Sequence, residues 1–144
     1  MRRSINITLV VILALSLTAC ATGTNFADLK PQMTAPSPDM GRIFFYRSTV
    51  FGALLYPDVM LNGERVGEAK ARGFFFVDRP AGDYTAVTST EVERKVSFTL
   101  DKGQTRFIRF KVSIGFFAGH VYGEIVDEAE AKEEISDCVY TGNQ

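Results

Sequence analysis

Few residues of this chain of 144 could perform acid, base or metal chemistry. With one histidine, His120, and no closely spaced pair of cysteines, a zinc site would have to use His120 with carboxylates alone, which is uncommon. A serine or cysteine nucleophile would need His120 as its base, and the sequence has no Gly-x-Ser-x-Gly turn to present one. We therefore expect His120 to be an ordinary loop residue, with no metal and no catalytic triad.

A pair of carboxylates is the remaining catalytic possibility. Asp58 and Asp78 are the candidates outside the acidic C-terminal region, and a glycosidase would need two carboxyl groups about 5–10 Å apart across a cleft. Both residues flank sequences typical of turns, where aspartate commonly bonds to nearby backbone. No phosphate-binding loop or dinucleotide fingerprint occurs. The sequence favours a protein that is not an enzyme and uses no cofactor, with a hydrolase as the alternative.

The charge balance excludes one class of partner. Lys and Arg number 16 against 17 Asp and Glu, for a net charge of −1, and no basic patch of the kind that nucleic acid requires is visible. Carboxylates crowd residues 124–137 against the single Lys132. This region indicates either the solvated face of a helix or an acidic docking surface.

The N-terminal segment has the composition of a secretory signal. Arg2 and Arg3 precede an apolar run over residues 5–17, with small residues before a cleavage point. The sequence Leu17-Thr18-Ala19-Cys20 resembles the lipobox of bacterial lipoprotein precursors. That resemblance implies that residues 1–19 are a removable signal peptide and that the Cys20 sulfur is lipidated. The alternative is a transmembrane anchor, but a spanning helix needs about 20 apolar residues and this run is shorter.

The resemblance to lipoproteins also implies a location. Ala21 follows Cys20, whereas retention in the inner membrane is associated mainly with aspartate at that position. We expect a cell-envelope protein held on the outer membrane by its lipid anchor and facing the periplasm.

Residues 20–40 are predicted to be the lipidated cysteine and a flexible tether. Pro31, Pro36 and Pro38 lie among small and polar residues, with no hydrophobic period. A coil of about 20 residues spans roughly 25 Å, which would hold a folded domain away from a lipid surface.

Residues 41–144 are predicted to form one domain, beginning with short apolar runs separated by turn residues. Asn62-Gly63 supplies the positive φ angles of a tight hairpin turn. The expected strands cover residues 41–47, the hairpin 58–67, 73–78, 84–88, 95–100, 106–112 and 121–126. The short turn at 79–83 predicts that strands 73–78 and 84–88 pair antiparallel, and residues 101–104 form the turn between the next two strands.

The hydrophobic pattern of the sequence changes from that of strands to that of a helix after residue 126. Asp127 and Glu130 form an N-cap pair, and Ala131, Ile135, Cys138 and Val139 fall on one apolar stripe, which predicts that Cys138 is buried. Strands with apolar and polar residues in alternation, followed by one helix, indicate a mainly β fold. We predict an antiparallel β-sandwich of six to eight short strands with one C-terminal α-helix.

Two apolar loops are the candidate contact sites. They cover residues 48–57 and 113–120, and loops this apolar either cap an open end of the sandwich or present a contact patch. The predicted anchors of a patch are Phe51, Leu54, Leu55, Tyr56, Phe116 and Phe117. Arg47 lies beside the first loop and could pair with an anionic group of a partner, or form a salt bridge with Asp58 or Asp78.

The region 41–126 resembles an uncharacterised family of bacterial envelope lipoproteins, a domain of unknown function that is distantly similar to the sandwich modules called PEGA domains. The motifs that carry the resemblance are Gly41-Arg42-Ile43-Phe44-Phe45-Tyr46-Arg47, Pro57-Asp58-Val59-Met60-Leu61-Asn62-Gly63, Gly73-Phe74-Phe75-Phe76-Val77-Asp78 and Pro80-Ala81-Gly82-Asp83-Tyr84-Thr85. The family implies a fold and a compartment but no activity.

Together these features predict a lipid-anchored cell-envelope protein that acts as a non-enzymatic binding or structural module. The alternatives are a hydrolase of envelope glycan or peptide and an accessory subunit of an envelope complex. Besides the membrane, an envelope protein is the expected partner.

Overall fold

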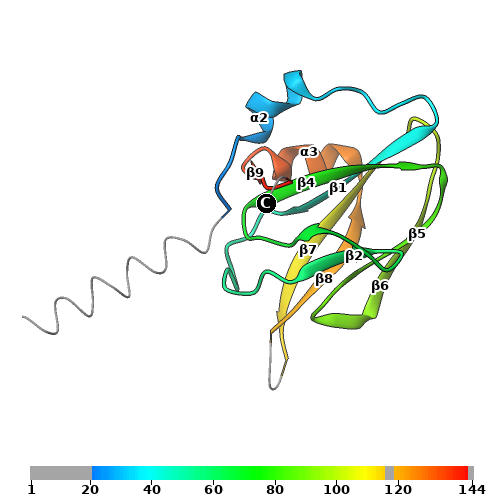
Figure 1. The fold of residues 1–144 in the computed structure, drawn as a ribbon. Coiled ribbons are helices and arrows are strands. Elements are labelled where there is room, and N and C mark those ends of the chain that lie inside the picture. The colour runs from blue at the N-terminus through cyan, green and yellow to red at the C-terminus, as the bar shows by residue number, and fades with distance from the viewer. Residues whose placement is uncertain (1–20, 116–118, 143–144) are drawn as a thin grey trace, which may run out of the picture.

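The fold has two sheets stacked face to face, with helices over the outer face of the larger sheet (Figure 1). It is known from a computed structural model, which describes residues 21–115 and 119–142. The prediction of a mainly β, sandwich-like domain with one C-terminal helix is confirmed. The described residues form nine strands, one more than the upper bound of the prediction.

The larger sheet has five strands. In spatial order these are β8 (Gly119–Val126), β7 (Thr105–Ile114), β1 (Met40–Arg47), β4 (Gly73–Pro80) and β9 (Val139–Tyr140). The central strand β1 is buried on both faces, as its aromatic-rich sequence requires. Ile43 and Phe45 point into the sandwich, while Phe44 and Tyr46 point toward the helices.

The smaller sheet has four strands. They are β3 (Glu64–Glu68), β2 (Asp58–Leu61), β5 (Gly82–Thr88) and β6 (Glu91–Leu100) in spatial order. The predicted hairpin turn between β2 and β3 is confirmed, because Asn62 and Gly63 have φ angles of 48° and 84°. Val59, Leu61 and Phe98 from this sheet complete the core between the two layers.

The connections between the sheets correct two predictions. Strands β4 and β5 do not pair, because the chain passes from the larger to the smaller sheet between them, and it returns between β6 and β7. The sandwich is also not wholly antiparallel, since β1 pairs parallel with β7 and β4 pairs parallel with β9. Three consecutive aromatic residues, Phe74 to Phe76, give β4 two apolar faces, which suits a strand covered on both sides.

Helix α3 (Glu128–Ile135) begins as predicted. The Asp127 side chain accepts hydrogen bonds from the backbone N–H groups of Ala129 and Glu130, at 3.0 and 3.1 Å. Ala131 and Ile135 face the core and Cys138 is fully buried, which confirms its prediction. The helix ends before Cys138, and the chain then turns into β9.

The segment that was predicted to be a flexible tether is instead packed on the domain over residues 21–33. It contains α2 (Phe26–Leu29) and a 3-10 turn, η1 (Lys30–Gln32). Backbone hydrogen bonds run from Phe26 N to Cys138 O, at 3.2 Å, and from Tyr140 N to Thr24 O, at 2.8 Å. Phe26 packs edge-on against Phe44 and Phe74. Because the segment contains prolines, its sequence pattern did not indicate this short apolar series, whose members are Phe26, Leu29 and Met33.

Replacing Gly23 with valine is expected to release this segment. A Cβ atom at Gly23 would lie 2.1 Å from the carbonyl oxygen of Tyr140, so the two backbones could not remain adjacent. The free energy of unfolding is expected to fall by about 2 kcal/mol, because burial of Phe26 is lost. Amide exchange at Phe26 and Tyr140 measures the release, with Ala27→Val at an exposed position as the control. Unchanged protection in Gly23→Val would contradict this expectation.

Candidate functional site

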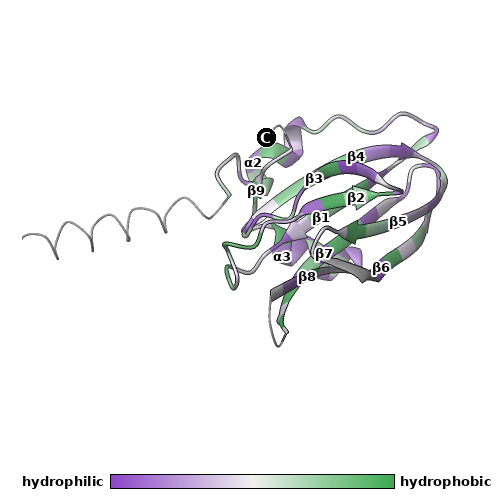
Figure 2. Ribbon diagram, turned by 60° about the horizontal axis from the view of Figure 1, so that its bottom comes forward, coloured by the Kyte–Doolittle hydropathy of each residue, from purple (hydrophilic) through white to green (hydrophobic). Residues whose placement is uncertain are grey.

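The loop between β1 and β2, residues 48–57, presents apolar side chains to solvent and is named here the apolar loop. It turns at Gly52, whose φ of 67° is one that glycine adopts readily, and Leu55 N donates to Gly52 O at 2.9 Å. Its exposed large side chains are Val50 (52%), Phe51 (53%), Leu54 (77%) and Tyr56 (51%). The loop carries hydrophobic residues in Figure 2, at the end of the domain where β1 finishes.

Arg47 fastens this loop from inside the domain. Its Nη1 donates to the carbonyl oxygens of Leu55, at 2.5 Å, and Ala69, at 3.1 Å. Its Nη2 donates to those of Phe51, at 2.5 Å, and Gly52, at 2.8 Å. The side chain is completely buried, and only Nε has no hydrogen-bond partner within the described structure. One guanidinium therefore satisfies three carbonyls of the loop.

Burial lowers the pKa of Arg47 from its ordinary value. Its hydrogen-bond partners are all backbone carbonyls, so the predicted salt bridge to Asp58 or Asp78 is wrong. Being enclosed, the side chain cannot reach an anionic partner as it stands. Arg47 holds the backbone of the apolar loop in place and does not reach its exposed surface.

The structure separates the predicted contact residues into three groups. Phe51, Leu54 and Tyr56 are exposed, as a contact patch requires, whereas Leu55 packs against the core between the sheets. The loop thus both caps the sandwich and presents a patch. Phe116 and Phe117 lie outside the described residues. Val50 and Ile114, which is 77% exposed on β7, are additional exposed apolar residues that the sequence analysis missed.

The apolar loop lies at the end of the domain where the described chain begins (Figures 1 and 2). Ala21 N donates to Ala71 O at 3.0 Å, and the Ala21 Cβ lies 3.1 Å from where a Cβ on Gly73 would be. Gly73 is the antiparallel partner of Arg47 across β1 and β4. A short series of contacts therefore links Ala21, through Gly73 and Arg47, to the apolar loop.

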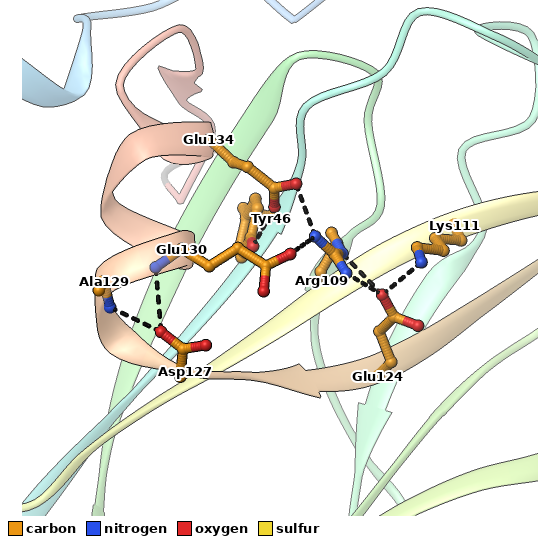
Figure 3. Close-up of polar contacts among 8 residues, drawn as sticks. All are labelled: Tyr46, Arg109, Lys111, Glu124, Asp127, Ala129, Glu130 and Glu134. Carbon is orange, nitrogen blue, oxygen red and sulfur yellow. Dashed lines mark hydrogen bonds and ion pairs between the residues drawn. The ribbon is translucent and has the colours of Figure 1, made fainter.

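A second polar cluster lies on the opposite face of β1 and fastens α3 to the larger sheet (Figure 3). Arg109 on β7 donates through Nη1 to Glu130 and Glu134 of α3, each at 2.6 Å, and through Nε to Glu124 of β8, at 2.7 Å. Tyr46 donates to the other oxygen of Glu134 at 2.6 Å, and Lys111 pairs with Glu124 at 2.7 Å.

The electrostatics of this cluster favour stability and not catalysis. Burial, reinforced by the hydrogen bond to Glu134, raises the pKa of Tyr46 far above its ordinary value. Partial burial alone would raise the pKa of Glu124, but hydrogen bonds from Lys111 and Arg109 outweigh it and lower that pKa. The Tyr46 phenol, which stays protonated, and the Glu124 carboxylate, which Lys111 and Arg109 hold ionised, have no proton to exchange near neutral pH. Part of the acidic region therefore serves to hold α3 against the larger sheet.

The two carboxylates considered for hydrolysis are not brought together. Asp58 begins β2, near the apolar loop, and pairs with Arg65. Asp78 lies toward the other end of β4 and binds Arg42 through both carboxyl oxygens, at 2.7 and 2.8 Å. The described part of the chain contains no cluster of three or more histidine, cysteine or acidic side chains able to hold a metal. His120 lies on β8, not in a loop as predicted, and its Nδ1 is 3.2 Å from Thr90 O.

Cys138 is expected to be chemically inert in the folded protein. Burial raises the pKa of its thiol to about 12, so very little thiolate exists at neutral pH. Alkylation at pH 8 should proceed only as fast as the protein unfolds, and should become rapid in denaturant. Fast alkylation of the folded protein would contradict the buried placement.

A family model described as a protein of unknown function, DUF2846, matches residues 37–122, more than half of the chain. The chain belongs to the DUF2846 family. The match includes Arg47, the apolar loop and Arg109, whereas the acidic partners of Arg109 at positions 124, 130 and 134 follow it. No curated protein and no solved structure is detectably similar to this DUF2846 protein. Within its described residues no helix is both long and apolar enough to cross a bilayer.

Proposed function

We propose that this DUF2846 protein is a lipid-anchored, non-enzymatic binding module of the bacterial cell envelope. The sequence Leu17-Thr18-Ala19-Cys20, behind a basic and then apolar segment, supports the anchor. Ala21 after the cysteine supports the outer membrane, with the domain facing the periplasm. The stacked sheets are compatible with the proposed likeness to PEGA modules.

The apolar loop is the observation that carries the binding role. Three of its predicted anchors, Phe51, Leu54 and Tyr56, remain more than half exposed, whereas the other aromatic residues that the structure describes are buried or half-buried. Exposed apolar side chains gathered on one turn are typical of contact sites. The carboxylates weighed for catalysis, Asp58 and Asp78, are instead held by arginines.

Lipidation of Cys20 is tested by metabolic labelling with an alkyne analogue of palmitate, followed by mass measurement of the N-terminal peptide. The expected product begins at Cys20 and carries a diacylglycerol on its sulfur. Cys20→Ala is expected to lose the label and Cys138→Ala, the matched control, to keep it. Membrane fractionation alone would not decide, because an uncleaved signal segment also holds a protein on a membrane. An unlabelled wild-type protein would refute the anchor.

A further inference from the structure

We propose that the apolar loop docks on the same lipid bilayer that holds Cys20, so that the domain lies on the membrane surface and does not stand off from it. The inference rests on the proposed lipid anchor and adds the orientation of the domain and the chemistry of its contact. The partner that the apolar loop contacts is the interfacial zone of a phospholipid bilayer.

The first argument is the length of chain between the anchor and the domain. Consecutive Cα atoms are about 3.8 Å apart, and Ala21 is already hydrogen-bonded to Ala71 of the domain. A diacylglycerol on Cys20 therefore brings the headgroup layer to within about one side-chain length of the domain surface. The roughly 25 Å of separation that a free tether over residues 20–40 would permit is not available while residues 21–33 are docked.

The second argument is which end of the domain this brings to the bilayer. Ala21 is hydrogen-bonded to Ala71, beside Gly73. Gly73 pairs with Arg47, and Arg47 binds the carbonyls of the apolar loop. The anchored end is thus the end that exposes Val50, Phe51, Leu54 and Tyr56. Figures 1 and 2 show the loop and the first described residues at the same side of the domain. Aromatic and aliphatic side chains together are the composition that enters the membrane interface.

The third argument is that the loop's backbone is prepared for a water-poor environment. A carbonyl group without a hydrogen bond is costly where lipid replaces water. Arg47 already satisfies the carbonyl oxygens of Phe51, Gly52 and Leu55 from the protein side. The side chains of the loop can therefore enter the membrane interface while these three carbonyl groups keep their hydrogen bonds. An ordinary surface loop relies on water for them.

The charge beside the anchor fits the surface of an anionic bilayer. Arg72 lies between Ala71, which binds Ala21, and Gly73, and its side chain is exposed. A cation at the depth of the headgroups attracts lipid phosphate. A lipid occupant accounts for both the apolar turn and this cation.

The test places a spin label on the full-length lipidated protein in vesicles of phosphatidylethanolamine and phosphatidylglycerol. Because Cys138 is fully buried, a cysteine introduced at Leu54 is the thiol that reacts. The matched control is Lys102→Cys, in the turn beside Met40 at the start of β1, about 26 Å along the strand from the loop end. Collisions of each label with dissolved oxygen and with a water-soluble nickel chelate report its depth.

The label at position 54 is expected to favour oxygen over nickel several-fold, whereas the label at position 102 collides freely with nickel. Leu54→Glu, with the label moved to position 50, is expected to restore collisions with nickel, and Leu54→Met is expected to leave the label protected. Free access of nickel to position 54 in protein whose Cys20 carries diacylglycerol overturns the docking and leaves the anchor intact. Cys20 without lipid overturns the proposed function instead. Protection in native membranes but not in the vesicles overturns lipid as the occupant in favour of a protein.

Discussion

Replacing Arg47 with methionine is expected to lower the free energy of unfolding by about 3–5 kcal/mol. The substitution leaves the carbonyls of Leu55, Ala69 and Phe51 without their donor, whereas Gly52 O keeps the backbone N–H of Leu55, and each buried carbonyl that loses its partner costs about 1–3 kcal/mol. The total is smaller than the upper limit of three such losses because the half-exposed loop can open and let water reach some of these groups. Chemical denaturation of the purified protein in detergent measures the change.

Two further substitutions separate hydrogen bonding from charge. Arg47→Lys keeps the charge but cannot reach both sides of the loop, so we expect it to recover less than half of the lost stability. Arg65→Met removes an arginine whose ion pair with Asp58 is solvent-exposed, and should change stability by less than about 1 kcal/mol. Equal effects of Arg47→Met and Arg65→Met would show that the carbonyl contacts of Arg47 contribute little.

Replacing Arg109 with methionine is expected to loosen α3 and to lower the free energy of unfolding by about 2–3 kcal/mol. Arg109 is the cation shared by Glu124, Glu130 and Glu134, and hydrogen bonds to charged groups contribute about 1.5–3 kcal/mol where they are partly buried. Lys132→Met removes an exposed pair with Glu128 on the same helix and is the matched control, with an expected loss of under 0.5 kcal/mol, about the value of one i,i+4 pair.

The same cluster predicts how stability depends on pH. The pKa of Glu124 is lower in the folded than in the unfolded state, so its contribution is complete above the unfolded value of about 4.3 and is lost as the pH falls through the lower folded value. Arg109→Met should therefore flatten the acid limb of a plot of unfolding free energy against pH. Lys111 still holds Glu124 in this variant, so part of the slope should remain. An unchanged acid limb would mean that the cluster does not control it.

Local features of the fold could be predicted because their causes are local. Asn62-Gly63 tolerates positive φ angles wherever it occurs, and Asp127 caps a helix through its own next turn. Alternating side chains in β7 predict a strand because the period of two belongs to the strand itself. Each of these inferences used residues within a few positions of one another.

Strand pairing could not be predicted because it depends on which faces must be covered. The short turn between β4 and β5 suggested a hairpin. Phe74 to Phe76, however, need apolar partners on both faces of their strand, and a strand of the larger sheet has them, from the smaller sheet on one face and from the helices on the other. The sequence likewise suggested a salt bridge for Arg47. Its partners are backbone carbonyl groups, which every residue type has and which the sequence therefore does not reveal. The sequence did not indicate the packing of Phe26, because a single aromatic residue in a segment that contains prolines shows no hydrophobic periodicity.

The pairing of residues 24–26 with residues 138–140 also sets an order in time. Ribosomes make a chain from its N-terminus, so residues 24–26 lack these backbone partners until nearly all the described domain has been synthesised. The same stretch closes onto the domain once β9 arrives. Docking of this N-terminal segment therefore depends on residues that are among the last of the described domain to be synthesised.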